Sequence, residues 1–138
     1  MVMKYLQLEP ESNLPDISSM KPFRTVVIVD DKPTSEWQAK VSEWLVRSGC
    51  LYMMAWGKDC SSWDDSVDSA NLEEFNFGDI PEDKFVMTTW HEKDSLSETF
   101  WFSKHNAFHP AVKLQNTVIL HISRNNREKE LLAGYAGA

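Results

Sequence analysis

The strongest constraint on the fold is a continuous apolar run at residues 23–30, with the sequence FRTVVIVD. Such a run predicts a strand that is buried on both faces, as the strands of parallel sheets are. Similar runs predict three further strands at residues 50–55, 85–89 and 116–122. Segments with helical spacing lie between and after them, at about 35–48, 61–75, 95–106 and 125–135. Strands that alternate with helices are typical of an α/β fold.

The pattern predicts a three-layer α/β/α sandwich around a mostly parallel four-stranded sheet, Rossmann-like or flavodoxin-like. Right-handed crossovers limit the possible topologies, and we expect the strand order 2-1-3-4. Residues 23–138 are expected to form a single α/β domain. Residues 1–22 are expected to be an N-terminal extension or an edge strand, with Tyr5, Leu6 and Leu8 as its apolar positions.

Helix starts are indicated by polar residues followed three positions later by Glu or Gln, the spacing of a capping box. The pairs are Ser35 with Gln38, Ser95 with Glu98, and Asn125 with Glu128. We therefore expect helices to open at these three places.

The charge of the chain is concentrated in one segment. The formal net charge is −7, and residues 59–83 contain nine acids and no Lys or Arg. These acids are Asp59, Asp64, Asp65, Asp68, Glu73, Glu74, Asp79, Glu82 and Asp83. A negative field repels nucleic acid and favours encounter with a basic protein. The alternative is a solvated acidic face that only maintains solubility.

The sequence also argues against several classes of protein. No apolar run approaches the length of a membrane span, and the first residues do not have the pattern of a signal peptide. We expect a cytoplasmic protein with no membrane partner, in which Cys50 and Cys60 are reduced. The five glycines never reach the spacing of a phosphate-binding loop, so no cofactor is predicted.

Ligands of parallel sheets bind beyond the carboxyl ends of the strands. Asp30 and Asp31 follow the first predicted strand, and His91 follows the third. A small hydrolase-like enzyme using His91 with Asp30 or Asp31 is therefore the alternative to an interaction protein. Asp31 has a simpler interpretation as a turn residue before the helix.

Cys60 precedes a helix, a position that can lower the pKa of a thiol and make it a nucleophile. The nearby Asp59, Asp64 and Asp65 oppose a thiolate, because like charges repel. A small, partly buried thiol is the simpler expectation.

His105 and His109 have the i, i+4 spacing of two zinc ligands on one helix. Pro110 indicates that the helix has ended there, and no Cys pair with zinc spacing is present. No metal site is therefore predicted. His121 lies in an apolar strand and is expected to be a hydrogen-bonded core residue.

Together these features predict an acidic protein–protein interaction module with a basic protein as partner. Immunity proteins, which neutralise a toxin, are often this small and acidic, which is an analogy and not a sequence motif. Acids would steer the encounter, and aromatic residues would anchor it. The predicted contact residues are Trp56, Asp59, Trp63, Asp64, Asp65, Asp68, Glu73, Glu74 and Trp90. A homodimer through exposed aromatic residues is a further alternative.

Four short stretches of the sequence resemble stretches of other proteins. They are TTWH at 88–91, FWF at 100–102, HNAFHP at 105–110 and Trp-Gly-x-x-Cys-x-x-Trp at 56–63. In these stretches the chain resembles a group of small bacterial proteins with no assigned activity. The resemblance implies a bacterial source and a compact α/β domain, and it assigns no catalytic residue.

Overall fold

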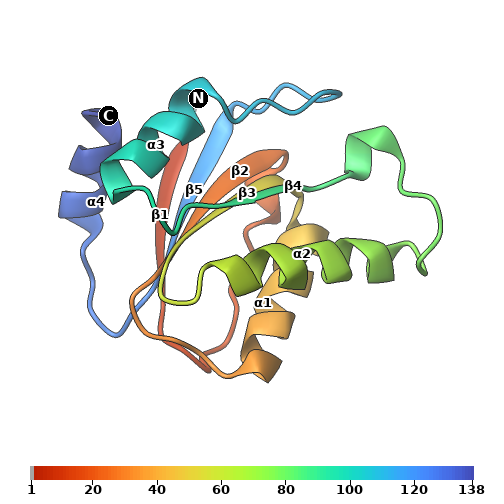
Figure 1. Ribbon diagram of the computed structural model, residues 1–138, viewed down its shortest axis with the longest axis horizontal. Coiled ribbons are helices and arrows are strands. Elements are labelled where there is room, and N and C mark those ends of the chain that lie inside the picture. The colour runs from red at the N-terminus through yellow and green to blue at the C-terminus, as the bar shows by residue number, and fades with distance from the viewer. Residues whose placement is uncertain (1) are drawn as a thin grey trace.

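The computed structural model describes residues 2–138, and these form one parallel sheet of five strands covered by helices (Figure 1). The strands are β1 (Met3–Leu8), β2 (Phe23–Val29), β3 (Cys50–Gly57), β4 (Met87–Trp90) and β5 (Asn116–Ile122). They lie in the order β1-β5-β2-β3-β4, and every neighbouring pair is parallel.

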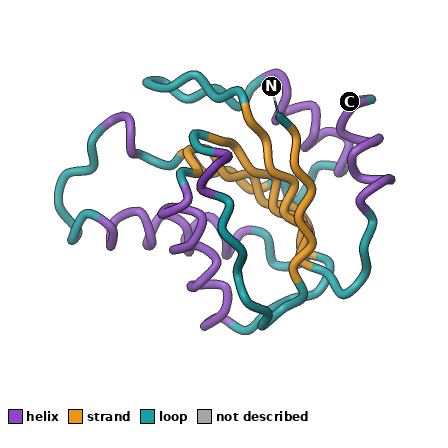
Figure 2. Tube along the Cα trace, turned by 180° about the vertical axis from the view of Figure 1, so that it is seen from behind, coloured by secondary structure: helices purple, strands orange, loops and turns teal. Residues whose placement is uncertain are grey.

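The helices form two layers, one on each face of the sheet. They are α1 (Ser35–Ser48), α2 (Ser61–Glu74), α3 (Leu96–His105) and α4 (Glu128–Ala136), with short 3-10 turns at Ser18–Met20 and Glu82–Lys84. Buried side chains of α1 and α2 share one core, and those of α3 and α4 share the other. Figure 2 shows the sheet between these two layers. The predicted three-layer α/β/α sandwich is therefore present.

The alternation of side chains along β2 explains why its apolar run is continuous. Val27 and Val29 point to the α1 and α2 core, while Val26 and Ile28 point to the α3 and α4 core. All seven residues of β2 are buried. A strand with helices on both faces needs apolar side chains at every position, as the sequence predicted.

The predicted four strands and the predicted order 2-1-3-4 are wrong. The sheet has a fifth strand, β1, which pairs along β5. The other four lie in the order β5-β2-β3-β4, which is 4-1-2-3 in the numbering of the prediction. Burial gives the physical reason. β4 is short and half-exposed, which suits an edge, whereas nearly every residue of β5 is buried, which suits the interior between β1 and β2.

One of the three predicted helix caps is confirmed. The Ser95 hydroxyl accepts a hydrogen bond from the Glu98 amide at 3.1 Å. The first helix is instead capped by Thr34, whose hydroxyl accepts from the Trp37 amide at 3.2 Å. The last helix begins at Glu128 and not at Asn125. In both corrected cases the cap differs from the predicted residue by one or two positions, a typical error for helix ends.

None of the helices in residues 2–138 has both the length and the apolar character that crossing a membrane requires.

Candidate functional site

The carboxyl ends of β2 and β5 form the topological switch point of the sheet. β2 continues into α1 on one face, whereas β5, its neighbour, continues into α4 on the other face. The loops after the two strands therefore diverge, and ligands of parallel sheets usually bind at such a place. Asp30 and Asp31 follow β2 here, as the sequence analysis expected.

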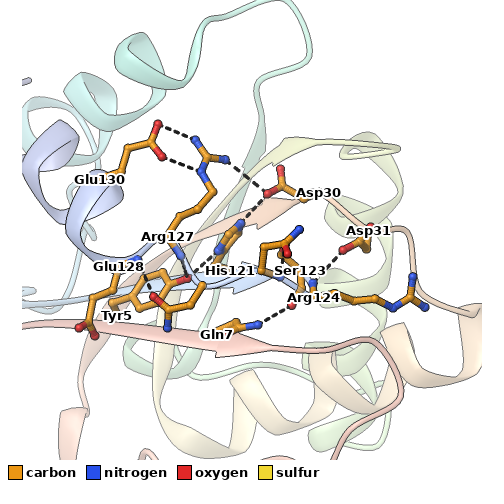
Figure 3. A network of polar contacts seen from close by, with 12 residues as sticks. Tyr5, Gln7, Asp30, Asp31, His121, Ser123, Arg124, Arg127, Glu128 and Glu130 are labelled. Carbon is orange, nitrogen blue, oxygen red and sulfur yellow. Dashed lines mark hydrogen bonds and ion pairs between the residues drawn. The ribbon is translucent and has the colours of Figure 1, made fainter.

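A chain of hydrogen bonds runs through this end of the sheet (Figure 3). The Tyr5 hydroxyl lies 2.6 Å from Nδ1 of His121, and Nε2 of His121 lies 2.6 Å from Oδ2 of Asp30. The three residues come from β1, β5 and the end of β2. The contacts thus join three neighbouring segments of the sheet that are distant in sequence.

The partners of Tyr5 determine how the protons of this chain are arranged. Its hydroxyl oxygen accepts a hydrogen bond from the Arg127 amide at 3.0 Å, so its own hydrogen is free to point at His121. With the Tyr5 hydrogen directed at Nδ1, the imidazole donates from Nε2 to the Asp30 carboxylate. Burial raises the pKa of Tyr5, which keeps the phenol protonated as this arrangement requires.

Arg127 closes the network on the solvent side. Its guanidinium lies 3.5 Å from Oδ2 of Asp30, and it makes two shorter hydrogen bonds to Glu130 at 2.8 and 2.9 Å. These hydrogen bonds lower the pKa of Glu130. Arg127 also precedes α4, so its contact with Asp30 joins the start of that helix to the end of β2.

Only the outer end of this network can be reached from solvent. The His121 side chain has no exposed surface, and Tyr5 is 9% exposed, whereas the Asp30 side chain is 31% exposed. A substrate could therefore touch Asp30 but not the imidazole. Each ring nitrogen of His121 already has a partner. The geometry is that of a structural hydrogen-bond network between strands and not of an acid–base pair that faces a substrate.

The Asp31 side chain contacts the loop that follows β5. Its Oδ2 accepts a hydrogen bond from the Arg124 amide at 2.8 Å, across the two diverging loops. The side chain of Gln7 donates to the Ser123 carbonyl at 3.0 Å and adds β1 to the same place. Asp31 therefore joins two loops that are distant in sequence, and the cap of the helix that follows is made by Thr34 instead.

His91 does not meet Asp30 or Asp31. Its Nδ1 lies 2.8 Å from the carboxylate of Asp94, and its Nε2 lies 2.9 Å from the hydroxyl of Thr89. β3 separates β4 from β2 in the sheet, which places the two strands about 10 Å apart. His121, expected in the core, is the histidine that contacts Asp30. The ring of His91 is 6% exposed and packs against Phe102.

Cys60 is 2% exposed and directly precedes α2. Burial raises the pKa of its thiol, and the nearby Glu92 charge raises it further. Both effects oppose a thiolate, so the local environment does not activate this cysteine as a nucleophile.

The two histidines with zinc spacing, His105 and His109, make different contacts. His105 is exposed and packs on Trp101, with ring centroids 4.9 Å apart. Nε2 of His109 lies 2.7 Å from the Phe85 carbonyl, and its Nδ1 accepts from the backbone at 3.1 and 3.2 Å. Both nitrogens of His109 are therefore occupied. Within residues 2–138, no group of three or more His, Cys, Asp or Glu side chains could hold a metal ion.

A second candidate site lies on α2 and on the segment that follows it, residues 75–86, which we call the acidic arm. Figure 1 shows the arm looping away from the sheet before it returns to β4. Among residues 2–138, Asp59 pairs with Lys32 at 3.5 Å and Glu74 pairs with Arg47 at 3.2 Å. The other seven acids of the segment make no ion pair there, and we call them the acidic surface: Asp64, Asp65, Asp68, Glu73, Asp79, Glu82 and Asp83.

The acids of α2 act on each other electrostatically. The pKa of Asp68 is raised, first by its partial burial and then by the charges of Asp64 and Asp65. Asp68 also accepts a hydrogen bond from the Thr88 hydroxyl at 3.0 Å, which ties α2 to β4. Asp65 is exposed and Asp64 is half-buried. The negative field of α2 is thus concentrated and remains uncompensated within the described chain.

The aromatic residues near the acidic surface differ in exposure from what the sequence suggested. Trp63 is 1% exposed and belongs to the core, so it cannot contact a partner. Trp56 is half-buried, and its indole donates to the Asp94 carbonyl at 2.9 Å. Trp90 is exposed. Sequence reasoning missed Phe77, which at 69% is the most exposed large apolar side chain of residues 2–138.

The arm is held in place at both ends. The Phe77 amide donates to the Leu72 carbonyl at 2.8 Å and closes the end of α2. The side chain of Asn71 accepts from the Val86 amide at 3.0 Å and donates to the Lys84 carbonyl at 3.2 Å. These bonds fix where the arm leaves α2 and where it returns.

The all-parallel sheet with helices on both faces places the chain among the three-layer α/β proteins. Within that class, residues 3–138 match the family described as "Domain of unknown function (DUF7684)". The chain belongs to this family. That membership is consistent with the resemblance to proteins of no assigned activity. Neither the curated proteins nor the solved structures contain a match to the chain.

Proposed function

We propose that this chain is a protein-interaction module that binds a basic protein through the acidic surface and the acidic arm. The observation that carries the proposal is a highly exposed phenylalanine among acids that have no ion pair in residues 2–138. Phe77 lies between Glu73 and Asp79 in sequence, at the point where the arm leaves α2. An exposed aromatic residue surrounded by one sign of charge is suited to anchoring a partner of the opposite charge.

Charge complementarity selects the class of partner. Seven carboxylates without a compensating cation repel nucleic acid and attract a positive protein surface. Exposed Phe85 and Trp90 extend the apolar part of the surface toward the β4 edge. The partner should present lysines or arginines around an apolar pocket. A toxin neutralised by an immunity-type protein would have this character, and we place the interaction in the bacterial cytoplasm on the sequence features described above.

The arm is fixed at both ends, and this lowers the cost of binding. Bonds from Asn71 to Lys84 and Val86 hold the arm near β4. The His109 ring holds the Phe85 carbonyl from the other side of the arm. A surface that is ordered before binding loses less conformational entropy when the partner arrives.

The hydrolase alternative is not supported in its original form. It needs His91 beside Asp30 or Asp31, whereas each of these side chains makes its hydrogen bonds to other residues. We therefore do not propose an enzymatic activity.

The test is capture of a partner at low and at high salt, followed by purification and an affinity measurement. The wild-type chain is compared with a triple variant, Glu73→Gln, Asp79→Asn and Glu82→Gln. We expect a basic partner that is released at high salt, and an affinity at least about tenfold weaker for the triple variant. All three acids are exposed, so the variant should fold normally.

A matched control removes three exposed acids elsewhere, with Glu9→Gln, Glu36→Gln and Glu128→Gln. The control has the same net charge as the test variant, and we expect it to retain the wild-type affinity. Equal loss in both variants would reduce the proposal to a general charge effect. A captured protein that is acidic, or a chain that associates only with itself, would contradict it.

A further inference from the structure

Arg24 is a buried cation without a carboxylate partner. It is the second residue of β2, near the amino end of the sheet, and it is 6% exposed. None of the ion pairs within residues 2–138 includes it. A guanidinium cannot lose its proton in a protein, and a buried charge is costly unless it is paired. The position therefore calls for an anion.

The hydrogen bonds of Arg24 leave donors unused. A guanidinium has five N–H donors. Nη2 donates to the Leu114 carbonyl at 2.9 Å, and Nη1 lies 3.4 Å from the Thr117 hydroxyl. Nε is buried and has no partner among the described residues. Both acceptors are neutral, so neither compensates the charge.

Arg24 lines a hollow of about 430 Å³. The rest of the lining comes from residues 108–114, and Figure 1 shows this loop between α3 and β5. Phe108, Pro110, Val112 and Leu114 contribute the apolar part of that lining. Lys113 is a second cation in the lining and is exposed.

The loop is fixed by its own histidine. Nε2 of His109 lies 2.7 Å from the Phe85 carbonyl, and Nδ1 accepts from the amides of Ala111 and Val112 at 3.1 and 3.2 Å. The imidazole is fully used in these bonds, so it leaves Arg24 as the deep polar group of the hollow. The hollow thus combines a buried cation with apolar side chains, and it is formed before any ligand enters.

We infer that Arg24 and this loop form a binding site for a small organic carboxylate with an apolar body. The carboxylate would accept from the unused Nη hydrogens of Arg24, next to the buried Nε, and the hydrocarbon would contact Phe108, Val112 and Leu114. Carboxylates suit a guanidinium because their oxygens match its planar donors. The formal net charge of −7 disfavours anions in general, so the attraction for the carboxylate would come from direct contact with the Arg24 guanidinium. None of the residues that line the hollow belongs to the acidic surface.

The experiment follows the Arg24 Nε–H resonance of the full chain by ¹H–¹⁵N NMR during addition of sodium hexanoate. Arg24→Lys, which lacks this group, assigns the resonance. We expect a saturable shift with hexanoate, a weaker affinity for acetate, and no shift with hexanol or with sodium chloride at equal ionic strength. Acetate lacks the apolar body and hexanol lacks the charge, so the two probes separate the two parts of the site.

Variants provide the second measurement. By isothermal calorimetry we expect Arg24→Met to weaken hexanoate binding at least about tenfold, because the charged hydrogen bond is lost. Arg124→Met removes an exposed arginine beyond the carboxyl end of β5 and should bind hexanoate as the wild type does. If Arg24→Met does not fold, the wild-type titration still decides the question.

Three results would overturn the inference. The first is an Arg24 resonance that hexanoate does not move, which would mean that the hollow holds only water. The second is an equal shift with sodium chloride, which would indicate general ion binding. The third is a folded Arg24→Met variant that binds hexanoate as tightly as the wild type.

Discussion

Phe77 adopts a backbone conformation that disfavours its own side chain. Its φ is +60°, and that of the preceding Asn76 is +54°. Asparagine tolerates this region, whereas a Cβ-bearing aromatic residue is strained there. The strain lies on the residue that we propose as the anchor of the acidic arm. Strain that persists at an exposed side chain is consistent with a function for that side chain.

Replacement of this residue should separate stability from binding. We expect Phe77→Gly to raise the free energy of unfolding by about 0.5 to 1 kcal/mol, because glycine adopts positive φ without a steric cost. The same variant should lose partner capture. Urea unfolding and the capture assay measure the two effects.

Phe85→Gly is the control. Phe85 is an exposed phenylalanine on the same arm with φ −75°, so glycine relieves no strain there and should lower stability. If Phe77→Gly also lowers stability, the assignment of strain to Phe77 fails.

Cys50 predicts how stability responds to alkaline pH. Burial raises the pKa of its thiol from 9.0 to about 12. The folded state therefore keeps the proton while the unfolded state releases it, so this contribution is complete below pH 9.0 and is lost between pH 9.0 and about 12. From about pH 8 to about pH 10.5, wild type should lose about 2 kcal/mol more than Cys50→Ala.

Urea unfolding of both proteins at the two pH values gives this difference directly. Other groups also titrate in this range, but they are common to both proteins and cancel. Equal losses in the two proteins would show that the Cys50 thiol does not keep its proton in the folded state at alkaline pH.

At the scale of elements, β1 depends on a single neighbour. It pairs only with β5, and the Tyr5 hydroxyl adds the bonds to His121 and to the Arg127 amide. Tyr5→Phe removes this hydroxyl and leaves the buried Nδ1 of His121 and the half-buried Arg127 amide without this partner. We expect a loss of about 1 to 3 kcal/mol in unfolding free energy, with faster amide hydrogen exchange in β1 than elsewhere in the sheet.

Tyr52→Phe provides the comparison. Tyr52 is a buried tyrosine of β3 whose hydroxyl makes no hydrogen bond among the described residues, so its loss should change stability little. Similar stability of the two variants would mean that the network around His121 contributes nothing to holding β1.

The elements that the sequence predicted well are those with a strong local pattern. The continuous apolar runs of β2, β3 and β5 required burial on both faces, and the sheet provides it. β1 was left undecided because MKYLQL has only a weak apolar pattern and is followed by a proline-rich segment. The strand order was missed because it depends on the edge at which each of the later crossovers adds its strand, and no local residue specifies that.

At the scale of the whole molecule, the sites depend on pairs that are distant in sequence. His121 and Asp30 are 91 positions apart, so only the fold reveals their contact. The charge of the segment 59–83 could be counted from sequence, but its ion pairs to Lys32 and Arg47 could not. Arg24 did have a local signal that the sequence analysis did not use, since a charged residue inside a fully buried strand requires an explanation.

The position of β1 at the sheet edge beside β5 has a consequence for folding during synthesis on the ribosome. Tyr5 and His121 are 116 positions apart, and translation at about 5 to 20 residues per second separates their synthesis by about 6 to 23 s. During that interval the first strand to be made has no template, while β2, β3 and β4 can already assemble. Nascent β1 must therefore stay unpaired until the last strand of the sheet emerges, and chaperones can bind it throughout this time.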